Sequence, residues 1–125
     1  MLRAAFFRDF KGADTFLIWG DNRGVRTLRA GLREVHQGRR ASLRIEGALG
    51  LSGLTLRVAP GDGLSEISEA ESDVIWLCSP DVLMSVLESV EILGAVSHGH
   101  QFAEVRGGLA SQVLISVNEY PETFR

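Results

Sequence analysis

The chain has 125 residues, of which 45% are hydrophobic and 23% are charged, and its net charge is −3. These proportions are ordinary for a soluble globular protein. The length fits a single α+β domain over residues 1–125 with a hydrophobic core of its own. No segment approaches the roughly 20 consecutive apolar residues that span a bilayer. We therefore expect a cytoplasmic protein with no membrane partner.

The N-terminus and the single cysteine agree with this location. Arg8 and Asp9 interrupt the first apolar run, so residues 1–9 lack the pattern of a signal peptide. Cys78 cannot form an internal disulfide, and it ends the apolar run Val74–Cys78. The sequence therefore predicts a buried, reduced thiol.

The two halves of the chain carry opposite net charges. Residues 1–57 hold eleven of the thirteen Lys and Arg residues and five acids, which gives +6. Residues 58–125 hold Arg106 and Arg125 against eleven acids, which gives −9. This asymmetry is the least generic feature of the composition.

The first half predicts strand, strand, helix, strand, strand. A strand over about residues 2–8 precedes an apolar run, Phe16–Asn22, that contains Trp19. Asp21 or Asn22 can cap the helix that follows, and Gly38 suits its left-handed exit. Two alternating strands, with a glycine-bearing turn around Gly47–Gly53, complete this half. The apolar face of the helix and the strand residues are Val25, Leu28, Leu32, Val35, Leu43, Ile45, Leu54, Leu56 and Val58.

The second half repeats this pattern after an acidic loop, Gly61–Asp73. The run Val74–Cys78 contains Trp76, Ser79 can cap the next helix, and Pro80 fits the first helical position. This helix is expected to reach His98–Gly99, followed by two strands around Phe102 and Val113–Val117 with a turn at Gly107–Gly108. One face of the helix is apolar: Val82, Leu83, Val86, Leu87, Val90 and Leu93.

The predicted order is β-βαββ-βαββ, with pseudo-repeat halves at about 14–60 and 72–120. We expect an antiparallel or mixed sheet of about seven strands with both helices on one face. The runs around Trp19 and Trp76 do not alternate, so both of their faces should be covered. A second copy of the chain could supply one cover, which predicts a homodimer.

Residues at the exit of the second helix are the only local group with metal-binding side chains: His98, Gly99, His100 and Gln101. A metal site needs three or four ligands, and no cysteine or further histidine lies nearby. No nucleophile elbow, phosphate loop or dinucleotide fingerprint is present. The sequence therefore predicts no metal, no cofactor and no enzymatic activity.

The first helix carries a basic flank of Arg26, Arg29 and Arg33, with Arg39 and Arg40 beyond it. A basic face can bind nucleic acid. This chain is acidic overall and has no aromatic residues among these arginines. We therefore expect the arginines to face solvent or the acidic half.

The outer face of the second helix predicts a partner-binding surface. Met84, Glu88 and Ile92 are spaced four residues apart, and Glu91 lies beside them. Exposed apolar side chains framed by carboxylates are typical of an interface. Packing of Met84 and Ile92 under a loop or against the other helix is the competing interpretation. The acidic loop adds Glu66, Glu69, Glu71 and Asp73 to the predicted surface.

Short motifs in the last fifty residues resemble a group of small bacterial proteins. Gly99-His100-Gln101-Phe102 follows the helix, and Ser116-Val117-Asn118-Glu119-Tyr120 ends the last strand. Together with Trp76–Asp81, they resemble uncharacterised α+β proteins of the immunity-protein type from polymorphic toxin systems. In that group Phe102 is replaced by tyrosine. The resemblance implies a cytoplasmic protein that binds and blocks a toxin without chemistry of its own.

The leading hypothesis is therefore a non-enzymatic protein-binding module, such as a bacterial immunity-type inhibitor of a basic toxin domain. The alternative is a small-molecule-binding module of duplicated βαββ type, similar to the glyoxalase/bleomycin-resistance superfamily, with a site between the halves. The metal ligands of that superfamily have no matching pattern here.

Overall fold

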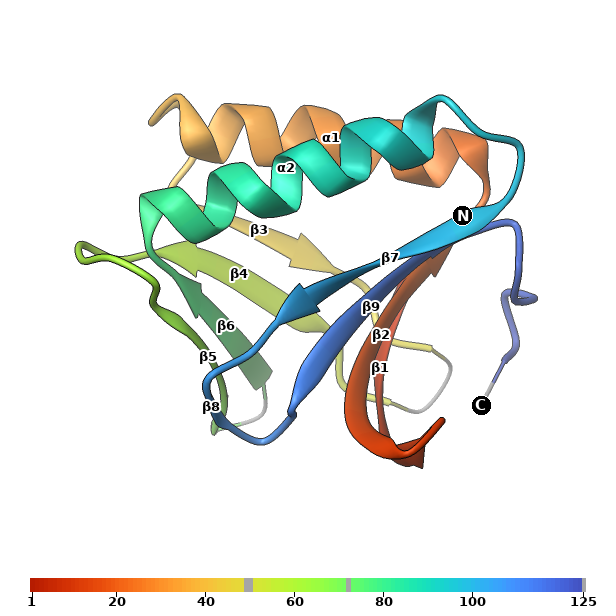
Figure 1. The fold of residues 1–125 in the computed structure, drawn as a ribbon, viewed down its shortest axis with the longest axis horizontal. Helices are drawn as coiled ribbons and strands as arrows, with labels where there is room; N and C mark the ends of the chain where they lie inside the picture. The colour runs from red at the N-terminus through yellow and green to blue at the C-terminus, as the bar shows by residue number, and fades with distance from the viewer. Residues whose placement is uncertain (49–50, 72, 125) are drawn as a thin grey trace.

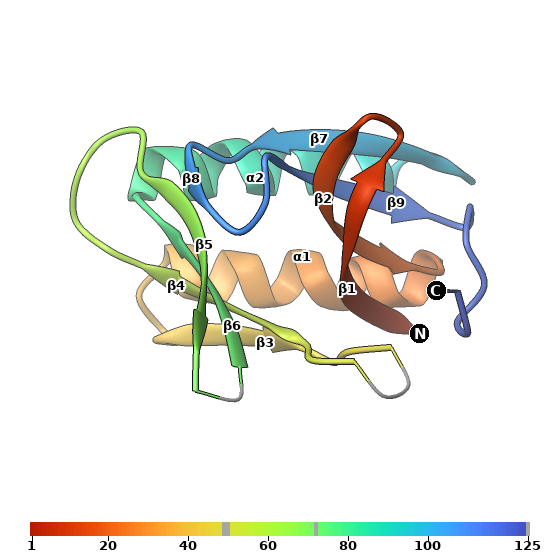
Figure 2. The ribbon, with the colours of Figure 1, turned by 90° about the horizontal axis from the view of Figure 1, so that it is seen from below.

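A computed structural model describes residues 1–48, 51–71 and 73–124. Within these residues, two helices lie side by side above two mixed β-sheets (Figure 1). Seen from below, α1 crosses the space between the two sheets (Figure 2). The elements are β1 (Leu2–Phe10), β2 (Ala13–Gly20), α1 (Asn22–His36), β3 (Ser42–Ile45), β4 (Leu54–Val58), β5 (Ser65–Ala70), β6 (Asp73–Cys78), α2 (Pro80–Gly94), β7 (Gly99–Glu104), β8 (Gly107–Gly108) and β9 (Gln112–Val117).

The α+β class is confirmed, but the predicted single sheet of about seven strands is wrong. In the described part of the chain, nine strands form a four-stranded sheet, β1-β2-β9-β7, and a five-stranded sheet, β3-β4-β6-β5-β8. The observed order also departs from β-βαββ-βαββ, because β5 and β8 are additional strands. The expected turn at Gly47–Gly53 lies partly outside the described residues, and Gly107–Gly108 forms β8.

The predicted acidic loop Gly61–Asp73 contains a strand, β5, and its last residue begins β6. The sequence of β5, SEISEA, has only two side chains that turn inward, Ser65 and Ile67. Its outward positions are glutamates and a serine, which give β5 the composition of a loop. The sequence of β8 does not predict a strand either, because its two glycines have no side chains that could alternate between polar and apolar.

Each sheet is built around a parallel pair of strands from distant parts of the chain. β2 pairs with β9, with Leu17 opposite Leu114, and β4 pairs with β6, with Leu56 opposite Trp76. The other main pairs, β1–β2, β3–β4, β5–β6 and β7–β9, are antiparallel. Each sheet therefore combines strands that precede β5 with strands that follow β4.

The two sheets also touch along their outer edges. The Ala4 amide on β1 donates to the Glu46 carbonyl just after β3, at 2.8 Å. On the other side, the Arg106 amide after β7 donates to the Ser65 carbonyl of β5, also at 2.8 Å. These contacts hold the sheets together below the helices.

The main hydrophobic core fills the space between the sheets and the helices. Trp76 is fully buried there, and its indole nitrogen donates to Ser65 Oγ at 3.0 Å. Cys78 is also buried, as predicted, and burial raises the pKa of its thiol to about 12. In β6 only alternate residues are buried, so the expectation that both of its faces are covered is wrong.

The outer face of the four-stranded sheet has a second, smaller core around Trp19. This residue is 1% exposed and its indole nitrogen donates to the Pro121 carbonyl at 2.9 Å. The aromatic side chains packed around it come from the β1–β2 hairpin and from the C-terminal segment: Phe7, Phe10, Tyr120 and Phe124. The chain thus supplies its own cover for Trp19, which needs no second copy for its burial.

The two helix starts use their capping residues differently. Asp21 caps α1 and accepts a hydrogen bond from the Gly24 amide at 2.8 Å. Ser79 is the N-cap of α2, with Pro80 next, but its hydroxyl donates to Asp81 instead of accepting from the helix. At the other end, α2 stops at Gly94, so the expectation that it reaches Gly99 is wrong.

Met1 contacts the N-terminal end of α1 through two polar interactions with Asp21. The Met1 ammonium lies 3.1 Å from Asp21 Oδ1, and the Asp21 amide donates to the Met1 carbonyl at 3.2 Å. This close approach requires a glycine at position 24, because a Cβ there would overlap the Met1 carbonyl oxygen.

Gly24→Ala should therefore lower the free energy of unfolding by about 1–3 kcal/mol, the usual cost of overpacking. Chemical denaturation monitored by tryptophan fluorescence measures this. Gly94→Ala is the matched control, because a Cβ at Gly94 meets only the end of the Arg29 side chain. Alanine favours a helix over glycine, so this variant should be as stable as the parent or slightly more so. Equal destabilisation of both variants would contradict the packing argument.

Candidate functional site

The outer face of α2 exposes the side chains that the sequence singled out. Ile92 is 54% exposed and Met84 is 37% exposed, while Glu88 and Glu91 are exposed beside them. This exposure favours the partner-binding interpretation over the packing of Met84 and Ile92 under a loop or against α1. The helix is held from below by its buried face: Leu83, Val86, Leu87, Val90 and Leu93.

The neighbouring helix, α1, places its arginines alongside this acidic face. Arg33 Nη2 lies 3.4 Å from Glu91 Oε1, and both side chains are about half exposed. Such surface pairs contribute little to stability. The two helices lie side by side at the top of the molecule (Figure 1), and Arg33 and Glu91 form an ion pair between them.

The other predicted acidic residues lie on a different part of the molecule. Glu66 and Glu69 are on β5, and Glu71 follows in the turn to β6. The far end of this hairpin lies at the bottom of Figure 1, whereas α2 runs along the top. The structure therefore divides the predicted surface into an α2 set and a hairpin set.

Asp73, the last of these acids, has partners within the chain. Its carboxylate accepts from Thr55 Oγ1 at 2.7 Å and from Arg44 Nη1 at 2.8 Å. The Thr55 hydrogen bond, helped by Arg44, lowers the pKa of Asp73 below its ordinary value of 3.8. Asp73 thus ties β6 to β3 and β4.

Because the folded chain lowers this pKa, the carboxylate stabilises the fold above about pH 4, and this contribution disappears as the pH falls further. Asp73→Asn should lower the free energy of unfolding by about 1 kcal/mol at pH 7 and by much less near pH 3. Urea unfolding at the two pH values measures the difference. The exposed Asp62→Asn removes the same charge without these hydrogen bonds and should leave the free energy of unfolding nearly unchanged at pH 7. An equal loss for Asp73→Asn at both pH values would contradict the role of its charge.

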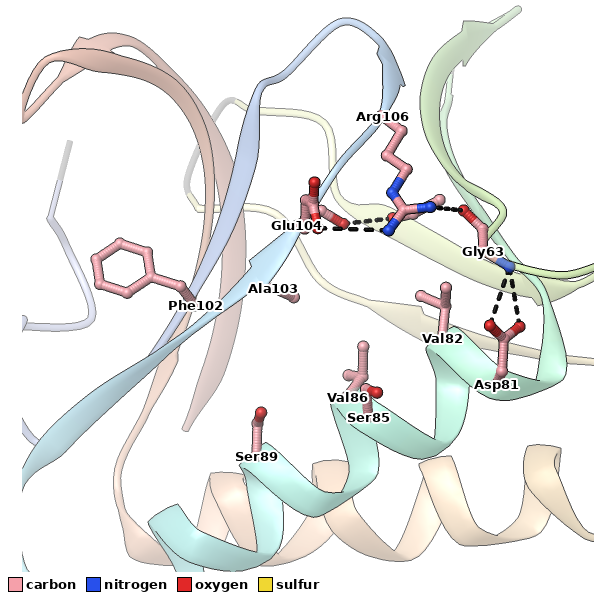
Figure 3. Close-up of a pocket in the computed structure, with 11 residues that line it drawn as sticks. Gly63, Asp81, Val82, Ser85, Val86, Ser89, Phe102, Ala103, Glu104 and Arg106 are labelled. Carbon is pink, nitrogen blue, oxygen red and sulfur yellow. Dashed lines mark hydrogen bonds and ion pairs between the residues drawn. The ribbon is translucent and has the colours of Figure 1, made fainter.

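A pocket of about 240 Å³ opens between α2 and β7 (Figure 3). Val82 and Val86 of α2 face Ala103 of β7 across it, and Ser85 and Ser89 also rise from the helix toward β7. The pocket is lined by Gly63, Ser65, Asp81, Val82, Ser85, Val86, Ser89, Phe102, Ala103, Glu104 and Arg106. It therefore adjoins the exposed face of α2.

Charged groups stand at the end of this pocket nearest the start of α2. Asp81 accepts hydrogen bonds from Ser79 Oγ and from the Gly63 amide. Both lower the pKa of Asp81, and the hydrogen bond from Ser79 has the larger effect. Arg106, which follows β7, has one nitrogen 3.4 Å from the Gly63 carbonyl and another 3.6 Å from Glu104 Oε2. One carboxylate and one carbonyl thus face this guanidinium, and both contacts are long, while the Asp81 carboxylate faces the Gly63 amide.

A second pocket occupies the matching position between α1 and β3. It is lined by Met1, Leu2, Arg3, Arg23, Gly24, Thr27, Arg44, Ile45 and Glu46. Two of its arginines already have carboxylate partners: Arg3 pairs with Glu122 at 2.6 Å and Arg44 with Asp73 at 2.8 Å. Both ion pairs join an arginine of the first half to a carboxylate of the second half.

The residues His98, Gly99, His100 and Gln101 do not converge on one point. His98 Nδ1 contacts Ser97 Oγ at 3.2 Å, while Gly99 to Gln101 start β7. His100 Nδ1 lies 3.0 Å from Glu119 Oε1 and its ring packs against Phe102. Among the described residues, no group of three or more His, Cys, Asp and Glu side chains could hold a metal ion.

Glu119 is a polar residue that the sequence argument did not connect to His100. It accepts from Ser116 Oγ at 2.5 Å as well as from His100. Partial burial favours a higher pKa for Glu119, but the hydrogen bonds from Ser116 and His100 outweigh it, and the pKa is lowered. The antiparallel pairing of His100 with Ser116 creates this contact, and only the strand register could have revealed it.

Comparisons with known proteins leave the site without a precedent. The chain matches no family model, no curated protein and no solved structure. In the described part of the chain, neither helix is long and apolar enough to cross a membrane. The α2 face and the α2–β7 pocket are therefore the features that bear on function.

Proposed function

We propose that this protein is a non-enzymatic binding module whose partner docks on the outer face of α2. The observation that carries the proposal is the exposure of Met84 and Ile92 on either side of Glu88, with Glu91 next to Ile92. When a partner covers large apolar side chains, their removal from water contributes favourable binding free energy. The carboxylates around them favour a basic partner and accelerate its approach.

The biological role that fits this surface best is that of an immunity-type inhibitor of a bacterial toxin. Such a protein needs no catalytic group, because it blocks its target by covering it. The −9 charge of residues 58–125 supports a basic target. The late motifs that contain His100 and Glu119 support the same class.

The pattern of strand pairing supports an internal duplication as well. β1 and β2 precede α1, and β3 and β4 follow it; β5 and β6 precede α2, and β7 and β9 follow it. In each unit the strand before the helix pairs in parallel with the last strand of the other unit. On this proposal the two units kept one architecture while their surface charges diverged.

A small-molecule ligand is the second candidate function. The α2–β7 pocket supports it, because it combines apolar walls with a few polar groups. Its lining comes entirely from residues 63–106, so this site would lie within the second unit. The space between the two units is filled by the main core.

The proteins encoded next to this chain are the partners to test first. Each is expressed with and without the chain in a bacterial host, and growth and co-purification identify a toxic partner. Glu88→Lys with Glu91→Lys should weaken binding to that partner about tenfold or more, equivalent to about 1.4 kcal/mol. The remaining affinity should depend less on salt, as isothermal titration at two ionic strengths measures.

The charge-matched control is Glu69→Lys with Glu71→Lys in the β5–β6 hairpin, which should bind as the parent does. Equal weakening by both pairs would indicate a general charge effect and contradict the α2 assignment. If the variant with Glu88→Lys and Glu91→Lys restored growth as fully as the parent does, this result would also contradict the α2 assignment.

A further inference from the structure

β7 is an edge strand next to the α2–β7 pocket. Within the described residues it pairs with β9 alone, on one side. Sheet edges that do not bind anything are usually protected by charged side chains, above all lysine, by proline or by a covering segment. β7 has the sequence GHQFAE, in which Glu104 at the last position is the one Lys, Arg, Asp or Glu residue, and its Phe102 is 53% exposed.

The direction of the backbone groups on β7 follows from its contacts at one end. The Glu104 carbonyl accepts from Ser65 Oγ at 2.8 Å, and the Arg106 amide donates to the Ser65 carbonyl. Both groups therefore point away from β9. Because backbone groups alternate in direction along an antiparallel strand, His100 and Phe102 also present their amides and carbonyls to the free edge.

The pocket beside this edge has the size and lining of a socket for one side chain. Its 240 Å³ is below the roughly 300–1,000 Å³ of small-molecule sites. Val82, Val86 and Ala103 make apolar walls, and Asp81 and Glu104 add carboxylates at one end (Figure 3). Lysine and arginine fit this combination, because they bury an apolar stem and keep a charged head at the rim.

From these observations we infer that β7 binds an extended segment of a partner protein, which adds a strand to the sheet and inserts a lysine or arginine into the α2–β7 pocket. Strand addition combines backbone hydrogen bonds with pockets for alternate side chains. The inference rests on the proposed function, because it assumes that the partner is a basic protein that binds beside α2. It adds that an extended segment of this partner binds to β7.

Arg106 shows how a cation is accommodated at this position. Its guanidinium lies between the Gly63 carbonyl and Glu104, but at 3.4 and 3.6 Å, and its side chain is mostly exposed. An incoming lysine or arginine can displace it into solvent and make shorter contacts with the same acceptors. Removing Arg106 should therefore strengthen binding.

The test titrates synthetic peptides into the whole ¹⁵N-labelled chain and follows its amide signals by NMR. The probe is a peptide of about nine residues, longer than the six-residue β7, with alternating Thr and Val and a central Lys. We expect the largest shifts at His100, Phe102 and the pocket residues. A peptide with central Glu should bind about tenfold more weakly or worse, because it would face two carboxylates.

Variants of the protein and the peptide separate the parts of the inference. Glu104→Gln should reduce the preference for Lys over Glu, and Arg106→Ala should increase affinity for the Lys peptide, while Glu69→Gln should change neither. A peptide N-methylated at alternate residues cannot form the strand hydrogen bonds and should not bind. Glu88→Lys with Glu91→Lys should alter peptide affinity less than about twofold, so loss of the α2 surface and loss of the β7 site are distinguishable.

Several results would overturn the inference. Shifts centred away from β7, equal affinity for the Lys and Glu peptides, undiminished binding of the methylated peptide, or no shifts at millimolar peptide would each do so. Concentration-dependent shifts of β7 without peptide, together with a dimer by light scattering, would assign the edge to a second copy of the chain.

Discussion

Two parallel strand pairs, β2 with β9 and β4 with β6, determine the architecture of this molecule. Each joins a strand from the basic part of the chain to one from the acidic part, so neither part has a complete sheet alone. The inward-facing residues of these strands meet the lower faces of α1 and α2 in the main core, while Leu17, Trp19 and Leu114 belong to the second core on the outer face. This arrangement fixes both helices side by side over both sheets. The surface charges of the two parts are then free to differ, because the interior that they share is apolar.

The proposed binding surfaces follow from this scaffold. α2 is anchored by its apolar face, so its outer face is presented on a rigid support with Met84 and Ile92 exposed. Each helix also has a pocket against the strand that follows it, α1 against β3 and α2 against β7. Around the first pocket, Arg3 and Arg44 are paired with carboxylates, whereas Arg106 in the second is held only by long contacts. The acidic half therefore offers the more accessible charged site.

The spacing of apolar residues predicted the elements that bury one face. It did not predict the strands whose residues are mostly polar or are glycines. Both helices, β3, β4 and β9 were predicted because their apolar side chains recur with regular spacing. β5 was missed because Ser65 and Ile67 are its only inward side chains, and β8 because it consists of glycines. The two-sheet arrangement could not be predicted, since pairing between β2 and β9 depends on residues almost one hundred positions apart. The exposed α2 residues were predicted from spacing alone. The α2–β7 pocket was not predicted, because it forms only when β7 lies beside α2 in the folded chain, and spacing along the sequence does not give that placement.

Native-state hydrogen exchange tests most directly whether the parallel pairs hold the molecule together. Amides in β2, β4, β6 and β9 should share the highest protection and exchange only through global unfolding, with one common free energy. Denaturant should affect all four strands in parallel, since none can lose its partner without opening a sheet. Exchange of β5, β6 and α2 at a clearly lower free energy, while β1 and β2 remain protected, would contradict this account.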